Sequence, residues 1–287
     1  MMRMMIRAAG AGVAAFAAYA AASAYGSLRW SSTTRKLVAR LLAGRIAPAI
    51  TRYHVGDLTG LPAPVQRYFQ VVLTDGQPII ATAKVTQKGV FNMSATAEQW
   101  KPFTASQVVT THRPGFVWSA TIMLFDGVPA RVVDAYVAGT GTLRPSILGP
   151  FPLADLHGTG EIARVELIRW FSETIWYPTA LLPSASVVWT AVDDHSANAT
   201  VTDEPLAVTL LFRFGGDGLI ASVHADARAQ MDGTTVTMAP WECTMSDYRR
   251  QDGILVPFAA TAGFVTPSGV RVYFKGTLLS VAYSFAG

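Results

Sequence analysis

Hydrophobic and polar residues alternate over most of the chain after residue 79, and such alternation is typical of β-strands that bury one face. Short turn signals, such as Asp126-Gly127 and Asp252-Gly253, separate the alternating stretches. Short strands at regular spacing predict an antiparallel meander. The predicted strands cover residues 79–90, 107–112, 116–125, 131–138, 186–192, 197–202, 206–214, 219–227, 234–247, 254–265 and 270–285.

One stretch inside this region, residues 159–183, has the spacing of a long helix, with Thr159 as its N-cap. Glu166, Arg169 and Glu173 fall on one side of it, because residues three and four apart are neighbours on a helix. Apolar and aromatic residues flank this charged stripe. The pattern predicts a partly buried ladder that lines a cavity, with Arg169 bridging both carboxylates. The alternative is a structural ion triad that fixes the helix against the sheet.

Four further segments refine this prediction. Residues 33–50 predict a helix with basic residues on one side and leucines on the other, typical of a helix on a membrane surface or of one packed on the protein body. Residues 65–73 predict a short helix that follows two prolines. Residues 139–158 contain several Gly and Pro residues and predict a loop at the rim. Gly89 predicts a bulge or a close approach.

Together these elements indicate an α+β fold. We expect a strongly curved antiparallel β-sheet, a half-barrel or partial barrel, with a central helix against its concave face and additional N-terminal helices. Residues 1–28 are predicted to form a signal sequence or membrane anchor, and residues 29–59 a basic amphipathic helix and linker. Residues 60–287 are predicted to form a single curved-sheet domain.

The N-terminal segment carries two arginines and then no charge over residues 8–28. A run of this length spans a bilayer, and Ala22-Ser23-Ala24 fits the small-x-small rule for signal cleavage. More basic residues follow the run than precede it, which for an uncleaved anchor favours a cytoplasmic body. We therefore expect a membrane-anchored or exported envelope protein that contacts the membrane through residues 1–45, with the side of the membrane left open.

Composition excludes several classes of function. The formal net charge is +4, and the basic excess lies near the N-terminus, so the rest of the chain is near neutral and no nucleic-acid surface is expected. Cys243 is the single cysteine, which excludes an intramolecular disulfide and a zinc site built on several thiolates. Its alternating neighbours predict a buried strand residue.

The familiar catalytic motifs are absent. Gly158-x-Gly160 imitates a dinucleotide fingerprint, but the segment before it contains prolines, and Glu161 would point a charge at a pyrophosphate. The five histidines lack metal-ligand spacing, and no GxSxG elbow of serine hydrolases occurs. We therefore expect no metal and no cofactor.

A series of short motifs follows in a fixed order along residues 60–283: Leu61-Pro-x-Pro-Val-Gln-Arg-Tyr, Gln87-x-Gly89-x-Phe91, Trp100-x-Pro102-Phe103, Pro114-Gly-Phe116-x-Trp118, Asp134-x-Tyr136, Glu166-x-x-Arg169-x-x-x-Glu173-x-x-Trp176, Trp189, Trp241 and Asp247-Tyr248-Arg249. This order resembles a bacterial family of unknown function, DUF6544 (formerly DUF6920). Val265 and Phe274 depart from it, since tryptophans are expected there. The pattern resembles more loosely the lipoprotein-carrier (LolA/LppX-like) half-barrels, which hold lipid, and that likeness concerns the fold alone.

Three hypotheses for function follow. In the first, the cavity binds a hydrophobic, lipid-like or polyketide-like small molecule, and Arg169 orients its acidic or carbonyl headgroup. In the second, the same cavity belongs to a cofactor-independent acid–base enzyme, a cyclase, isomerase or hydrolase, with Glu166, Arg169 and Glu173 as catalytic residues. In the third, the triad braces a structural envelope protein. The candidate ligand-binding residues, for which core packing is the alternative, are Trp118, Tyr136, Trp170, Trp176, Tyr177, Trp189, Trp241, Tyr248, Arg249 and His112.

Overall fold

The computed structural model of the chain describes residues 2–94, 96–149, 151–232 and 235–287, and of these it describes the side chains from residue 17 on, except 18, 231, 232 and 235. Within these ranges, 14 strands form one antiparallel sheet. The strands are β1 (Ile80–Asn92), β2 (Trp100–Thr110), β3 (Gly115–Phe125), β4 (Val128–Val137), β5 (Thr140–Ile147), β6 (Phe151–Pro152), β7 (Leu156–Gly158), β8 (Val187–Asp193), β9 (Ser196–Asp203), β10 (Leu206–Phe214), β11 (Ile220–Asp232), β12 (Thr235–Gln251), β13 (Ile254–Thr266) and β14 (Gly269–Phe285).

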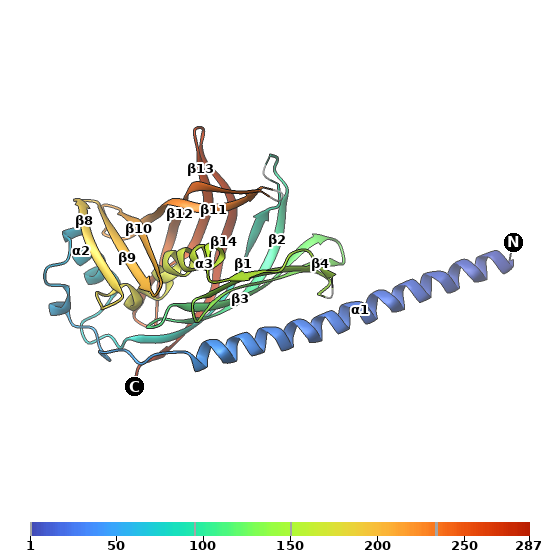
Figure 1. The fold of residues 1–287 in the computed structure, drawn as a ribbon, viewed down its shortest axis with the longest axis horizontal. Coiled ribbons are helices and arrows are strands. Elements are labelled where there is room, and N and C mark those ends of the chain that lie inside the picture. Colours follow the sequence, from blue (N-terminus) through green and yellow to red (C-terminus); the bar gives the residue numbers. More distant parts are fainter. Residues whose placement is uncertain (1, 95, 150, 233–234) are drawn as a thin grey trace.

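The strand order is β6-β5-β4-β3-β2-β1-β14-β13-β12-β11-β10-β9-β8, and β7 pairs with β5. Two meanders therefore run outward from a central pair, β1 and β14, which are the first and last strands in sequence. The path has free ends at β6 and β8, so the sheet is open. Figure 1 shows it curling around α3 (Glu161–Ser172), which lies on its concave side. The predicted α+β half-barrel with a central helix is confirmed.

The central pair of strands approaches closely at Gly89, which is paired with Gly276. A Cβ atom on Gly89 would lie 2.0 Å from the Lys275 carbonyl oxygen and 2.7 Å from the Phe103 ring. Any larger residue would therefore push the strands apart. The close approach predicted at Gly89 is confirmed.

The central helix is shorter than predicted. α3 begins after Gly160 rather than Thr159, and it is followed by two 3-10 turns, η2 (Glu173–Trp176) and η3 (Pro178–Leu181). The Ser172 and Thr174 hydroxyls donate to the carbonyl oxygens of Arg169 and Phe171, and such bonds compete with the helical pattern. A proline at 178 then rules out a regular helix to residue 183.

The prediction of a loop over residues 139–158 was wrong, because this segment contains β5, β6 and β7. Gly139 and Gly149 do lie in turns, but Gly141 and Pro145 lie within β5. A Cβ atom on Gly141 would lie 2.5 Å from the Ile162 carbonyl oxygen, so this glycine lets β5 pass against α3. Pro145 is tolerated because β5 has a full-length partner only on its β4 side.

The N-terminal helix α1 (Met2–Ala43) is continuous and ends at Ala43 instead of residue 50. Its C-terminal part packs on the outer face of β3 and β4, where Trp30 donates to Ser119 Oγ at 3.0 Å. The apolar side of the helix predicted at residues 33–50 therefore packs on the protein body, which was one of the two alternatives for this segment. Its contacts there involve Trp30, Leu37, Val38 and Leu41 on the helix and Val117, Val133, Ala135 and Val137 on the strands.

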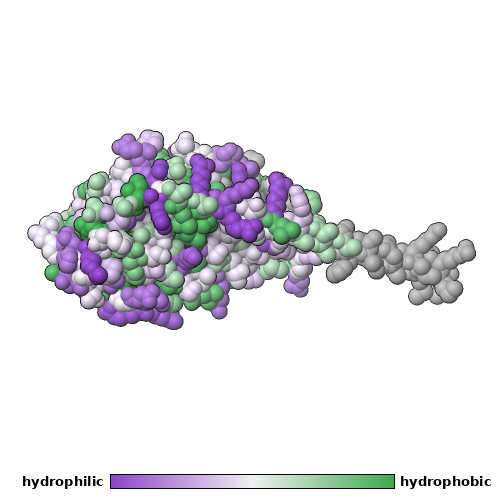
Figure 2. Space-filling view, turned by 90° about the horizontal axis from the view of Figure 1, so that it is seen from below, coloured by the Kyte–Doolittle hydropathy of each residue, from purple (hydrophilic) through white to green (hydrophobic). Residues whose placement is uncertain are grey.

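The N-terminal half of α1 projects beyond the sheet (Figure 1), and its described surface near the body is weakly hydrophobic (Figure 2). Among the residues that the structure describes, no helix is long and apolar enough to cross a membrane. Most of the predicted signal or anchor segment, up to residue 16, lies outside the described side chains.

Two short helices lie between α1 and the sheet in sequence. They are η1 (Val55–Leu58) and α2 (Ala63–Val72), the latter close to the helix predicted at residues 65–73. α2 buries Val65, Tyr68 and Phe69 against the end of the sheet formed by β9 and β13.

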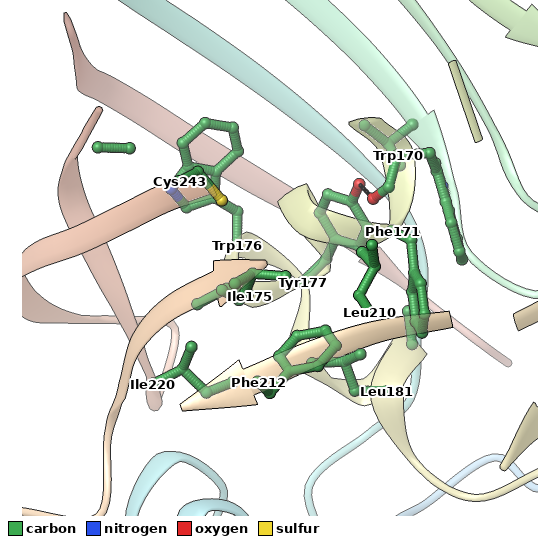
Figure 3. Close-up of a cluster of buried hydrophobic side chains, with 14 of the residues drawn as sticks. Trp170, Phe171, Ile175, Trp176, Tyr177, Leu181, Leu210, Phe212, Ile220 and Cys243 are labelled. Atoms are coloured by element: carbon green, nitrogen blue, oxygen red, sulfur yellow. Dashed lines mark hydrogen bonds between the residues drawn. The ribbon is translucent and has the colours of Figure 1, made fainter. Parts of the chain in front are cut away.

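The main core lies between α3, η2, η3 and the strands β10 to β12. Figure 3 shows Phe171, Leu210 and Phe212 packed beside Trp170 and Tyr177. This solid core holds one side of α3 in place and leaves its other side facing the centre of the sheet.

Candidate functional site

A cavity of about 950 Å³ lies between α3 and the concave face of the sheet. Its wall combines one side of α3 and η2 with inward-facing residues of β1, β3, β4 and β11 to β14. Most of the wall is apolar, and the aromatic side chains in it include Phe91, Trp118, Trp176, Trp241, Tyr273 and Phe274.

Arg169 is the centre of a buried polar cluster on this wall. Its Nε donates to Glu173 Oε1 at 2.9 Å, and its Nη1 donates to Asp134 on β4. The guanidinium group lies over the rings of Trp118 and Phe116, 4.6 and 5.1 Å from their centres. Burial lowers the pKa of Arg169, but Glu173 and Asp134 raise it more, so the side chain stays charged.

The helical spacing predicted that Arg169 would pair with Glu173 and Glu166. The pairing with Glu173 is confirmed, but the second carboxylate that contacts Arg169 is Asp134 and not Glu166. Glu173 is also fixed from the sheet, because Gln107 Nε2 donates to its Oε2 at 2.6 Å. The sequence analysis did not include Asp134 among the candidate site residues, although the alternation along β4 places it on the opposite face from Val133 and Ala135. The outward positions Val133 and Ala135 pack against α1, so Asp134 is a charge on the inward face and needs a partner there.

Glu166 is buried beside this cluster, with 2% of its surface exposed. Burial, followed by the charge of Asp134 and a hydrogen bond between the two carboxyl groups, raises the pKa of Glu166 well above its ordinary value. Glu166 Oε2 and Asp134 Oδ1 otherwise have no hydrogen-bond partner among the described residues. A proton held by Glu166 would satisfy both atoms, and the raised pKa favours this protonated form of Glu166 in the cavity wall.

A second polar group lies on β11, β12 and β14. Arg228 Nη1 donates to the Tyr273 hydroxyl at 2.9 Å, and Trp241 Nε1 donates to the same oxygen at 3.0 Å. The Arg228 guanidinium lies over the Trp241 ring, 5.1 Å from its centre. All three side chains line the cavity, and sequence reasoning missed Arg228 and Tyr273.

The structure brings some of the predicted site residues to the cavity and places others elsewhere. Glu166, Arg169, Glu173, Trp118, Trp176 and Trp241 line it.

The remaining candidates point into the core or to solvent, where most of their polar atoms have local partners; His112 Nε2 is buried and has none among the described residues. Trp170, Trp189 and Tyr177 donate to carbonyl oxygens in the core (Figure 3 shows Trp170 and Tyr177). Tyr136 donates to Asp203 and Tyr248 to the Ile220 carbonyl oxygen. Arg249 is exposed and pairs with Asp247, and His112 lies outside the cavity wall, where burial lowers its pKa.

Cys243 lies on β12 and is buried, as predicted, with its side chain in the cavity wall. Burial, and to a lesser degree Glu173, raises the pKa of this thiol to about 12, so the thiol is protonated and a poor nucleophile. In the described ranges, no three His, Cys, Asp or Glu side chains gather in a way that suits a metal ion.

Comparison with known proteins gives a family but no activity. A family model described as "Family of unknown function (DUF6920)" matches residues 59–283. No curated protein matches the chain.

Two solved structures are similar in fold. A LolA superfamily protein from Nitrosomonas europaea is 8% identical, with 78% of this chain and 94% of that chain covered and a TM-score of 0.41. A putative outer membrane lipoprotein-sorting protein domain from Vibrio parahaemolyticus is 7% identical, with 71% of this chain and 86% of that chain covered and a TM-score of 0.38. A likeness at this level carries no argument about function.

Proposed function

The chain belongs to the DUF6920 family, whose function is unknown, and we propose that its cavity binds a hydrophobic, lipid-like or polyketide-like small molecule. The observation that carries this proposal is a volume of about 950 Å³ walled mainly by apolar and aromatic side chains, with two hydrogen-bonded polar clusters set into this wall. Ligand pockets in proteins commonly have volumes of about 300–1,000 Å³ and this kind of wall.

The environment of Arg169 changes the role predicted for it. Asp134 and Glu173 already occupy two of its nitrogens, and aromatic rings cover its face. The carboxyl groups of Asp134, Glu166 and Glu173 surround a single guanidinium group, so this cluster is rich in acceptor oxygens. Such a cluster favours a hydroxyl or another donor group of a ligand over an acid.

We also propose association with a membrane of the cell envelope, on the side where α1 projects. Met93 and Val236 line the cavity, yet they are 50% and 58% exposed, so the cavity opens beside the tips of the β1–β2 and β11–β12 hairpins. Tyr19 of α1 donates to the Gly127 carbonyl oxygen at the β3–β4 turn, which is at the same end of the sheet. The projecting part of α1 and the mouth of the cavity therefore lie at the same end of the sheet, the end that carries the β1–β2, β3–β4 and β11–β12 turns.

Native mass spectrometry of the purified protein tests the binding function. We expect the wild type to carry an apolar molecule, and Ala262→Phe, which fills the cavity wall on β13, to lose it. Ala191→Phe, at an exposed position outside the cavity, is the matched control and retains the molecule. A wild-type protein that stays empty across a broad panel of lipids and apolar metabolites would contradict the proposal.

The neutral Glu166 supports one alternative, a cofactor-independent acid–base enzyme that uses the same cavity. A carboxylic acid kept protonated in an apolar site is able to donate a proton to a bound substrate. If the molecule released from the wild type is chemically altered relative to the one bound by Glu166→Gln, the enzyme hypothesis is favoured. Identical molecules in both proteins favour simple binding.

A further inference from the structure

Arg228 differs from Arg169 in the groups that surround its guanidinium group. Arg169 forms ion pairs with Asp134 and Glu173, whereas no ion pair is described for Arg228, which is held by the Tyr273 hydroxyl and the face of the Trp241 ring. Arg228 Nε is buried and has no hydrogen-bond partner among the described residues. A buried donor without a partner costs free energy, because it has lost its hydrogen bonds to water. A ligand that supplies an acceptor to Arg228 Nε would remove this cost.

Tyr273 adds a second donor at the same place. Its hydroxyl oxygen already accepts hydrogen bonds from Arg228 and Trp241, so its own hydrogen must point away from both. No acceptor for that hydrogen is found in the described part of the chain. Stacking on Phe264, with ring centres 5.6 Å apart, holds the Tyr273 ring in position.

The cluster thus consists of donors only. Arginine, tryptophan and the outward hydrogen of a tyrosine hydroxyl whose lone pairs are used all donate. This is the opposite of the Arg169 cluster, where carboxylates dominate. The two polar groups of the cavity therefore suit different parts of a ligand.

We propose, on the basis of the binding function above, that the ligand is an amphiphile with an oxyanion headgroup, a carboxylate or phosphate, which binds to Arg228 and Tyr273. Its apolar part lies along the aromatic wall. A guanidinium group that forms two parallel hydrogen bonds to an oxyanion gives both affinity and orientation. Arg228 and Tyr273, not Arg169, determine the headgroup specificity.

Fluorescence titration with cis-parinaric acid and its methyl ester at pH 8 tests this assignment. The two probes share one apolar chain and differ in the charge of the headgroup. We expect the wild type to bind the acid about tenfold or more tightly than the ester, since hydrogen bonds to a charged group are stronger than those to a neutral one. Arg228→Met should bring the acid down to the affinity of the ester, and Tyr273→Phe should weaken the acid severalfold.

The ester measures the integrity of the cavity in each variant, and Arg249→Met is the matched control, because Arg249 is exposed and outside the wall. We expect this control to leave both affinities unchanged. Equal wild-type affinities for acid and ester would overturn the headgroup assignment while leaving the binding function intact, and so would an equal loss of both probes in Arg228→Met. A wild type that binds neither probe nor any other apolar molecule contradicts the binding function itself.

Discussion

Arg169 and Arg249 are both paired with carboxylates, but their surroundings give these pairs different energetic weight. The Arg169 side chain is 16% exposed and lies between aromatic rings, whereas the Arg249 side chain is 59% exposed. Water screens an exposed pair, so it contributes about 0–1 kcal/mol. Removal of one partner from a buried pair leaves an uncompensated charge and costs about 3–5 kcal/mol.

Glu173→Gln should therefore lower the free energy of unfolding by about 3 kcal/mol, because Arg169 loses one of two carboxylates in a nearly dry site. Asp247→Asn, which breaks the exposed pair with Arg249, should cost less than about 1 kcal/mol. Asparagine suits this control because Asp247 has a φ of 56°, which asparagine tolerates. Urea unfolding of the three proteins measures both values, and equal losses would mean that the Arg169 cluster is as well solvated as the surface pair.

Glu166 predicts how stability depends on pH. Its pKa is raised in the folded protein, so the folded state binds the proton more tightly than the unfolded state does. This contribution is complete below the ordinary pKa of 4.5 and is lost as the pH rises toward the folded value, by up to about 1.4 kcal/mol per pH unit. Glu166→Gln imitates the protonated acid. The variant should therefore become more stable relative to the wild type as the pH rises from 5 to 8, and a difference that does not change with pH would show that Glu166 is ionised.

At this scale, the sequence predicts contacts within one helix better than contacts between elements. Arg169 and Glu173 are one turn apart on the same helix, so their pairing follows from local spacing. Asp134 and Arg228 reach the cavity from distant strands, and their positions depend on the register and curvature of the sheet. Too many aromatic residues were assigned to the site. Nothing in the sequence distinguishes Trp170 and Trp189, which point into the core, from Trp118, which lines the cavity.

The contact between α3 and β5 is the element-scale feature that sets one side of the cavity. Gly141 brings the β5 backbone against the first turn of α3, where the nearest helix atoms belong to the backbone and cannot rotate away. Gly141 was one of several Gly and Pro residues that made residues 139–158 look like a loop. Gly and Pro signal turns on average, yet here one serves close packing and the other lies in a strand near the sheet edge.

Gly141→Ala should destabilise the protein by about 1–3 kcal/mol and weaken ligand binding, because α3 must shift away from β5. Gly216→Ala is the control, since a Cβ atom there meets nothing within 4 Å and the substitution should be nearly neutral. Thermal unfolding and probe affinity are the two measurements. A neutral Gly141→Ala would show that the helix is held mainly from its core side.

At the scale of the whole molecule, α1 divides into a part packed on the sheet and a part that projects from it. The packed part uses Trp30, Leu37, Val38 and Leu41 against β3 and β4. The curved sheet and its helix were predictable because alternation and turn signals repeat along the chain. The continuity of α1 across two predicted segments was not, since the basic residues after residue 28 indicated a boundary that the helix does not have.

Deletion of residues 1–28 should leave a folded protein, because the apolar side chains Trp30, Leu37 and Leu41 that pack on the sheet lie after the deletion, although the hydrogen bonds of Tyr19 and Ser27 are lost. The protein should then move from the membrane fraction to the soluble fraction. Circular dichroism and fractionation of cells that express each form measure the two effects. Full-length protein found entirely in the soluble fraction before any deletion would contradict the proposed membrane association.

The central pairing of β1 with β14 also has a consequence for synthesis on the ribosome. Ile80 pairs with Phe285, so the first strand of the sheet gains its second neighbour only when β14, the last strand of the sheet, has left the exit tunnel. Until then, β1 is an unprotected edge able to pair with other nascent chains, and each meander is able to form only by itself. The joining of the two halves is therefore a late step in the folding of the sheet, and it is the stage at which a chaperone that shields bare strands would have its greatest effect on yield.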